Sequence, residues 1–385
     1  MLVGQTANCA ILDDWAHHDN VYKQSSFAPK KVLYDISEPF RMDSQVAALE
    51  KTKNEGKERR KRKRPQLNCY VDPKFQQTCK HVVAVHADIV NLGQNFFHEK
   101  QEDSFKNNKD ARAAANELSG LDALPCSSGQ MSSFVEVDLA GSDSMKWHDD
   151  CCVLWRNSSN DCITVELSNS KYILPPRSAF ILGDASLSRH LIQSSRTFDF
   201  ILLDPPWENK AVKRQKTYAT SFEDDLLSLP IDTLLAENGL VAIWVTNNQR
   251  LQRFVEDKLL AKWNLQKLAR WHWLKLTTGG EFVCDFKPHY KVPFESIIFA
   301  SRATDIFPSS TINCQKNLPE EFVFASTPSA VHSRKPSLNE LLAHFDRKFS
   351  NCLEYFARYL LPNTVSIGFE ALKLQNVAYF DEVCE

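Results

Sequence analysis

Four consecutive residues, Asp204, Pro205, Pro206 and Trp207, have the types and spacing needed to bind an amine for chemistry. The prolines fix two backbone φ angles and remove two N–H donors, and each favours extended geometry at the preceding residue. The loop is therefore rigid and presents acceptors: the Asp204 carboxylate and the proline carbonyls. Two such acceptors can bind both N–H donors of an exocyclic amine and direct its lone pair at an electrophilic methyl group. Such a transfer depends on positioning more than on a strong base.

The aromatic residue of this loop, Trp207, adds a face on which a purine can stack, which contributes about 1–3 kcal/mol per base. The base has to be single-stranded or flipped out of a duplex to reach it. A plainer interpretation is a proline-stiffened turn in which Asp204 caps a helix. The apolar residues 198–203 favour the chemical interpretation, because a buried strand there would carry Asp204 to the carboxyl end of a sheet.

The elements that position this loop are predicted from apolar runs of strand length that alternate with helical patterns. Such runs indicate a mostly parallel sheet covered on both faces, a doubly wound α/β domain. We expect strands at residues 179–182, 198–203, 240–245, 268–276, 296–300 and 364–367, and helices at 226–235, at 249–258 and within 338–361.

The region before this sheet differs in composition. Residues 1–135 are mixed and polar, and we expect a partly flexible extension there. Residues 136–178 read as a small β-rich segment, with short apolar runs at 134–139, 151–155, 163–167 and 172–174. The catalytic domain is expected to span 179–385.

Composition narrows the class of protein. The chain has 385 residues, of which 43% are hydrophobic and 24% charged, the balance of a soluble globular protein with a sizeable core. The net charge of −2 means that a nucleic-acid site has to come from local basic patches. No apolar run reaches the roughly 18 residues of a membrane span. The 11 cysteines are expected to be reduced thiols, and the spacing of Cys69, Cys79 and His81 fits no common zinc pattern, so no metal is expected.

Two basic segments are candidates for contact with nucleic acid. Residues 57–64 hold seven cations in eight positions, which indicates a nuclear localisation signal or a phosphate-contacting arm, with a solvated loop as the alternative. A second group directly follows the catalytic loop and could form a phosphate-binding rim beside it. It comprises Lys210, Lys213, Arg214 and Lys216. His289 and Lys291 are expected to form a lid at the same opening.

Ordered blocks after residue 179 carry a family resemblance. These are ENKAVKR at 208–214, AIWVTN at 242–247, WHWLK at 271–275, PFE at 293–295, HSRKP at 332–336 and LEYFAR at 353–358. Together with the loop at 204–207, they resemble the adenine-specific N(6)-methyltransferases that share a DPPW loop. Within that family the blocks are most similar to the methyltransferase-like 4 branch. The resemblance covers roughly the last half of the chain.

This resemblance implies a Rossmann-like, circularly permuted methyltransferase sheet that binds S-adenosylmethionine. The lack of a Gly-x-Gly-x-x-Gly sequence in the α/β region agrees with it, because that sequence is typical of nicotinamide dehydrogenases. The residues that it implies for the cofactor are Asp184 and Ala185 for the adenine, with Lys335, Glu354 and Arg358 for the ribose and amino-acid portions, beside Asp204. It implies Asn209 as a substrate contact.

Positions on and after the last strand depart from the family pattern. Val365 and Ile367 stand where the methyltransferase-like 4 branch tends to carry Trp. After the last strand the family has Gly-Asn followed by Gln or Glu, whereas this chain has Gly368, Phe369 and Glu370. Phe369 neither donates nor accepts a hydrogen bond, so one ribose contact would be lost unless Glu370 replaces it.

The function that follows is methyl transfer from S-adenosylmethionine to the 6-amino group of adenine in RNA. By resemblance the substrate is 2′-O-methyladenosine of U2 small nuclear RNA, in a nuclear protein for which a monomer is favoured. DNA adenine is the near alternative. A catalytically silent nucleic-acid-binding subunit, and an enzyme that methylates a protein or small-molecule amine, are the alternatives from other classes.

Overall fold

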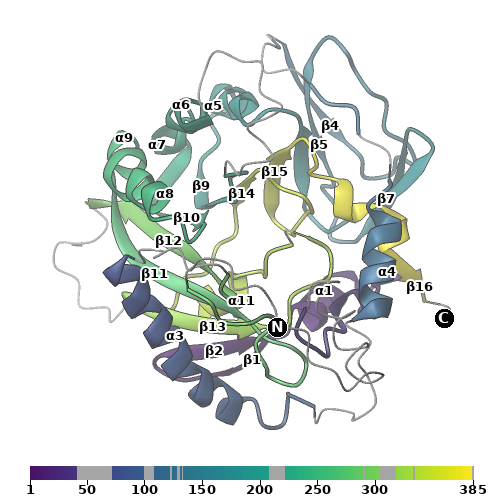
Figure 1. Cartoon of the computed structure of the whole chain (residues 1–385). Helices are drawn as coiled ribbons and strands as arrows, with labels where there is room; N and C mark the ends of the chain where they lie inside the picture. The colour runs from purple at the N-terminus through teal and green to yellow at the C-terminus, as the bar shows by residue number, and fades with distance from the viewer. Residues whose placement is uncertain are drawn as a thin grey trace, which may run out of the picture.

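A computed structural model describes residues 1–40, 72–98, 108–121, 124–127, 131, 133–207, 222–288, 291–303, 318–332 and 334–383. These residues form one twelve-stranded sheet and two small two-stranded sheets, with helices packed around them (Figure 1). The strand order in the large sheet is β1-β2-β13-β11-β12-β10-β9-β14-β15-β8-β5-β4.

The strands of the large sheet are β1 (Leu2–Gln5), β2 (Cys9–Leu12), β4 (Phe134–Asp138), β5 (Cys152–Arg156), β8 (Ala179–Leu182), β9 (Phe198–Leu203), β10 (Leu235–Val245), β11 (Leu265–Lys275), β12 (Phe294–Arg302), β13 (Glu321–Ser326), β14 (Cys352–Tyr355) and β15 (Thr364–Gly368). The small sheets pair β3 (Phe27–Pro29) with β16 (Phe380–Glu382), and β6 (Ile163–Leu167) with β7 (Ser170–Leu174).

The helices are short apart from α3 (Pro73–Leu92). The others are α1 (Asp14–Tyr22), α4 (Lys109–Leu118), α5 (Arg189–Gln193), α6 (Phe222–Leu227), α7 (Ile231–Leu234), α8 (Gln249–Arg253), which continues through the π-helical turns Phe254–Leu259 into α9 (Leu260–Lys262), and α11 (Asn339–His344). Turns of 3-10 helix cover Lys31–Tyr34, Ala185–Ser188, Lys373–Gln375 and Val377–Tyr379.

Strand β9 shows why the centre of the sheet is parallel and covered on both faces. Ile201 and Leu203 point into one hydrophobic cluster, which includes residues of α5 and α7. Phe200 and Leu202 point into a second cluster on the other face, which includes residues of α11. A strand that is apolar on both faces is typical of a buried parallel sheet. This confirms the expected α/β class with a mostly parallel sheet.

The directions of the paired strands place most of their carboxyl ends at one edge of the sheet. Strands β8, β15, β14, β9 and β10 are mutually parallel. Strand β12 is antiparallel to both β10 and β11, so β11 runs in the same direction as β10. Strands β13 and β2 continue in that direction. The carboxyl ends of these strands, except antiparallel β12, therefore lie along one edge, where α/β proteins bind their ligands.

The expected strands at 163–167, 179–182 and 198–203 are confirmed at those bounds. The prediction of one continuous helix at 226–235 is wrong. The structure has two separate helices there, α6 and α7, and residue Leu235 already belongs to β10. The segment 338–361 contains α11 as expected, but it also contains β14, a central strand that the sequence did not predict.

The N-terminal segment contributes to the large sheet a strand that the sequence did not predict. Its strand β2 is fully buried and pairs with β13, and β4 and β5 extend the opposite side of the same sheet. Strands from all three expected segments thus join one sheet, and the boundaries at 135 and 178 stay a prediction. The basic run at 57–64 lies outside the described residues.

Candidate active site

The DPPW loop begins where β9 ends, at the carboxyl edge of the sheet. The Asp204 N–H donates to the Tyr355 carbonyl of neighbouring β14 over 3.4 Å. Pro205 is buried and Pro206 is exposed. The loop therefore starts at a fixed height beside β14 and then emerges at the surface, as the sequence predicts for a carboxylate carried by a buried strand.

Two hydrogen bonds fix the rest of the loop. The Trp207 backbone N–H donates to the Pro205 carbonyl over 2.7 Å, which closes a three-residue turn. The Trp207 indole Nε1–H donates to the Trp244 carbonyl of β10 over 2.8 Å. The loop thus presents the Asp204 carboxylate and the two proline carbonyls, and the Pro205 carbonyl already accepts one hydrogen bond within the loop.

The Asp204 carboxylate belongs to a chain of alternating charges. Lys335 Nζ lies 3.1 Å from Asp204 Oδ1 and 3.0 Å from Asp204 Oδ2. The same ammonium lies 3.1 Å from Glu295 Oε2, and Glu295 is also paired with Lys275. Lys335 Nζ lies 5.4 Å from the centroid of the Trp244 ring, which adds a cation–π contact. This network holds the Asp204 carboxylate in one orientation.

Burial and pairing set the protonation of these groups. Burial raises the pKa of Asp204, and the nearby Lys335 ammonium opposes that rise. Desolvation lowers the pKa of Lys335, but Asp204 and Glu295 outweigh it and raise that pKa overall. Burial works against ionisation of Glu295 as well, yet Lys275 and Lys335 hold its pKa at about 2. Lys335 and Glu295 are therefore charged at neutral pH and keep a cation against Asp204.

Glu354 lies on β14 beside Asp204 and has a different character. The residue is only 6% exposed, and its Oε2 has no hydrogen-bond partner among the described residues. Burial, together with the negative charge of Asp204, raises its pKa to about 8. A buried carboxyl without a partner is unfavourable unless a ligand supplies one. A ribose hydroxyl supplies such a partner, so this atom fits the role that the family resemblance implies for Glu354.

The other residues expected at the cofactor follow β8, β14 and β15 along the same edge. The Asp184 carboxylate accepts the Ser186 N–H over 2.8 Å and caps a 3-10 turn, and Ala185 is buried. Arg358 pairs with Glu370 over 3.4 Å. This edge thus gathers acidic groups and an arginine, the donors and acceptors that a nucleoside with an amino-acid tail requires.

The end of β15 is shaped by a close backbone approach. A Cβ atom on Gly368 would lie 2.8 Å from the Ala357 carbonyl oxygen, so a glycine is needed there. Phe369 next to it is 56% exposed, with its ring outside the core. Phe369, which departs from the family pattern, therefore lies in solvent at the same edge of the sheet. The roles expected for Asp184, Ala185, Lys335, Glu354, Arg358, Phe369 and Glu370 stay predictions.

Most of the expected substrate contacts fall outside the described residues. These are Asn209, Lys210, Lys213, Arg214, Lys216 and His289. Lys291 is described: it is exposed, and its N–H and carbonyl pair with the Lys287 carbonyl and N–H in a tight hairpin. That hairpin leads into β12, whose first residues lie at the carboxyl edge because β12 is antiparallel to its neighbours.

Sequence reasoning missed Glu295, Lys275 and Trp244 as members of the site. All three lie inside the blocks that carry the family resemblance, at 293–295, 271–275 and 242–247. A search of those blocks for charged residues at strand ends would have found the first two. Trp244 gave no such signal, because it is uncharged and contributes a backbone carbonyl and the face of its ring.

The described part of the chain contains neither a candidate metal site nor a candidate membrane span. No cluster of three or more His, Cys, Asp or Glu side chains there could hold a metal ion. No helix there has the length and apolar character needed to cross a membrane.

Comparison with known proteins agrees with this geometry. The model of the MT-A70 family matches residues 198–370, which include β9, the DPPW loop, β14 and β15. A Caenorhabditis elegans protein named DNA N6-methyl methyltransferase is 34% identical over 378 residues, which cover 96% of this chain and 97% of that protein.

Two further relatives match just over half of the chain. The human N(6)-adenine-specific methyltransferase METTL4 is 38% identical over 227 residues, 58% of this chain and 48% of the human protein. The Pyricularia oryzae N6-methyladenosine RNA methyltransferase MTA1 is 34% identical over 222 residues, 54% of this chain and 57% of the fungal protein. The chain therefore spans nearly all of the C. elegans relative and about half of the human one.

Proposed function

The chain belongs to the MT-A70 family of adenine N(6)-methyltransferases, and we propose that it methylates the 6-amino group of adenosine in RNA. One observation carries this proposal. A carboxylate on a proline-stiffened loop, Asp204, lies at the ligand-binding edge of the sheet beside an unpartnered buried carboxyl, Glu354. The first group fits the amine of the substrate, and the second fits the hydroxyl of a nucleoside cofactor.

In this proposal the chain contributes mainly orientation. The Asp204 carboxylate and the Pro206 carbonyl accept the two N–H groups of the target amine, which directs its lone pair away from the loop. Lys335 keeps Asp204 ionised and in place. S-adenosylmethionine supplies, when bound, a methyl group on a positively charged sulfur. The nitrogen gives up one proton after transfer, and Asp204, whose side chain is 21% exposed, passes it to solvent.

The residues proposed to hold the cofactor lie on one side of Asp204, on or just after three successive strands of the sheet. Glu354 is on β14 and Arg358 follows that strand, Glu370 follows β15, and Asp184 with Ala185 follows β8. Together they offer a carboxyl for the ribose, a guanidinium for the carboxylate of the amino acid, and a capped turn for the adenine.

The decisive experiment is methyl transfer to total RNA and to genomic DNA by wild-type and Asp204→Ala protein, followed by mass spectrometry of the nucleosides. We expect N(6)-methyladenosine from the wild-type protein and at least a 100-fold lower yield from the variant, roughly the loss seen when an oriented transition-state contact is removed. Asp381→Ala, at an exposed aspartate of β16, is the matched control. Equal yields from wild-type and Asp204→Ala protein would refute the proposed role of the loop.

DNA adenine is the second candidate substrate. The observation that favours it is the C. elegans relative, which is similar over nearly the whole chain and is named for DNA methylation. The same experiment separates the candidates, because N(6)-methyldeoxyadenosine and N(6)-methyladenosine have different masses.

We propose 2′-O-methyladenosine of U2 small nuclear RNA as the specific substrate, supported by the resemblance to the methyltransferase-like 4 branch. Paired RNA oligonucleotides that differ only in the 2′-O-methyl group of the target adenosine test it. We expect a higher kcat/KM for the methylated strand, and equal values would exclude the specific substrate without affecting adenine methylation in general.

A nuclear location is proposed from the basic run at 57–64 alone. Fusion to a fluorescent protein, with and without replacement of that run by alanines, tests it. The intact fusion should concentrate in the nucleus and the altered fusion should not.

A further inference from the structure

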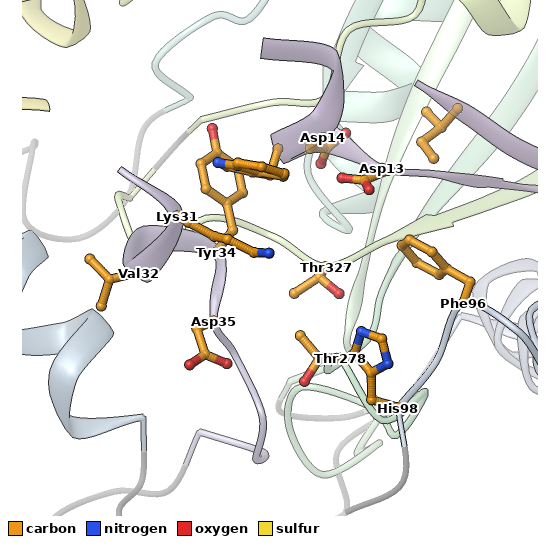
Figure 2. A pocket seen from close by; sticks show the side chains of 12 residues that line it. Asp13, Asp14, Lys31, Val32, Tyr34, Asp35, Phe96, His98, Thr278 and Thr327 are labelled. Atoms are coloured by element: carbon orange, nitrogen blue, oxygen red, sulfur yellow. The ribbon is translucent and has the colours of Figure 1, made fainter. Parts of the chain in front are cut away.

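A second cavity opens at the same sheet edge as the DPPW loop. It has a volume of about 450 Å³ and is walled by the segments that follow β2, β13 and β11 (Figure 2). These three strands run parallel to one another and to β9, so the cavity and Asp204 share the carboxyl edge. Four strand spacings of about 4.8 Å separate β13 from β9, which places the cavity about 19 Å from the loop.

Aromatic rings form a large part of the wall. Trp15, Tyr34, Phe96 and His98 all line the cavity, and they come from three different segments of the chain. The Trp15 indole is held by a bond of 3.1 Å from its Nε1 to the Pro29 carbonyl. Flat rings in a space of this size suit a flat ligand, because unpaired bases of single-stranded nucleic acid stack on such side chains.

Carboxylates supply the polar part of the wall. Asp13, Asp14 and Asp35 line the cavity together with a single lysine, Lys31. Asp13 Oδ1 accepts the Ala16 N–H over 2.8 Å, and Asp14 Oδ2 accepts the Ser326 hydroxyl over 2.7 Å. These bonds fix the direction of both carboxylates. Acidic walls repel a phosphate but accept hydrogen bonds from amino groups, as Asp and Glu do from cytosine N4.

We propose that this cavity binds an amino-bearing base of a nucleotide that flanks the target adenosine in the same strand. The base stacks on a ring face that Lys31 does not cover, its amino group meets the carboxylates, and its phosphate lies near Lys31, whose Nζ is 4.6 Å from the centroid of the Trp15 ring. A separation of about 19 Å corresponds to a few nucleotides, since one strand of a duplex advances about 3.4 Å per nucleotide and a stretched single strand advances further. The inference rests on the proposed function, because it assumes a nucleic-acid substrate.

The test measures binding, so that it does not depend on catalysis. A fluorescent single strand with one central adenosine is titrated with the full chain, and an abasic site is placed in turn at each position within six nucleotides of that adenosine. We expect one position, away from the target, at which the abasic site weakens binding about 5- to 100-fold, the range for loss of one stacked base. At that position cytosine should bind more tightly than uracil.

Variants locate the effect in the cavity. Trp15→Ala should remove the sensitivity to the abasic site, and Trp15→Phe, which retains a ring, should restore it. Asp35→Asn should reduce the preference for cytosine, whereas Asp381→Asn, at an exposed aspartate on β16, should leave it unchanged. Because Asp35 is exposed, its substitution leaves the fold intact.

Two outcomes would overturn the proposal. One is an abasic scan with no sensitive position outside the target. The other is a sensitive position that responds equally in Trp15→Ala and wild-type protein. A third result would assign the cavity to a cationic peptide instead. In that case no abasic position would weaken binding, and a trimethyllysine peptide would bind tightly to the wild-type protein but not to Trp15→Ala. If the protein transferred no methyl group to any RNA or DNA, the proposed function would be refuted. The binding measurements would still decide whether the cavity binds a base.

Discussion

At the scale of single residues, the site depends on how its carboxyl groups are paired. Asp204 and Glu354 are both affected by burial, but only Asp204 is bonded to a cation, Lys335. Asp204 is therefore oriented as an acceptor. Glu354 has a pKa of about 8 and is largely protonated at neutral pH. The sequence predicted both residues, but it could not predict this difference, because burial and pairing arise from strands far apart in the chain.

Lys335→Met should shift the pH dependence of methyl transfer. Without the ammonium, the main opposition to the effect of burial on the pKa of Asp204 is lost and only Arg358 opposes it, so the carboxylate becomes protonated at higher pH than in the wild-type protein. The rate at saturating cofactor should therefore fall more at pH 6 than at pH 8. Lys335→Arg keeps the cation and serves as the control. A loss of equal size at every pH would mean that Lys335 acts only on the fold or on cofactor binding.

Glu354→Gln should stabilise the cofactor-free protein at alkaline pH. The pKa of Glu354 rises from 4.5 to about 8 on folding, so its contribution to stability is fully present below pH 4.5 and is lost as the pH rises through 8. The glutamine has no such dependence, and the variant should gain up to about 5 kcal/mol relative to wild type above pH 8. Denaturant unfolding at pH 5, 7 and 9 measures this, and a constant difference across the three values would contradict it.

At the scale of elements, the sequence predicted those strands whose apolar run is long and continuous. Strand β9 is six residues with one polar side chain, and its bounds were predicted correctly. Strand β14 was missed, because it has four residues with Glu354 among them and looks locally like part of a helix-containing segment. Its place between β9 and β15 depends on backbone pairing with partners about 150 residues before it and about 12 after it, which no local pattern encodes.

Trp207→Phe should loosen the DPPW loop while keeping an aromatic ring. The change removes the bond from the indole Nε1–H to the Trp244 carbonyl, which contributes about 1 kcal/mol to the free energy of unfolding. The loop would then hold its acceptors less firmly, so kcat should fall at least about tenfold. Trp147→Phe is the matched control, since it removes an indole bond to Asp149 and packs against a different hydrophobic cluster from Trp207. Similar kcat values for both variants would rule out an orienting role for the Trp207 indole.

At the scale of the whole molecule, composition predicted a globular chain with a sizeable core but not how far along the chain that core extends. The expectation of a partly flexible N-terminal extension misses that β2 is a buried strand of the large sheet. Four apolar residues are too short a signal to predict a strand, and the partner strand β13 begins more than 300 residues later. The same segment continues into Asp13, Asp14 and Trp15, so it links the sheet directly to the second cavity.

Ile11→Ala should therefore destabilise the whole protein. Ile11 is fully buried in the cluster that joins β2, α3, β11 and β13, and loss of a large aliphatic side chain from such a core costs about 2–5 kcal/mol. Val3→Ala, at an exposed position of β1, is the control and should change the free energy of unfolding by less than about 0.5 kcal/mol. Denaturant unfolding followed by circular dichroism measures both. If β2 is part of the cooperative unit, the single unfolding transition of the Ile11→Ala protein moves as a whole to lower denaturant. An unchanged main transition would instead mean that the N-terminal strands unfold separately from the catalytic sheet.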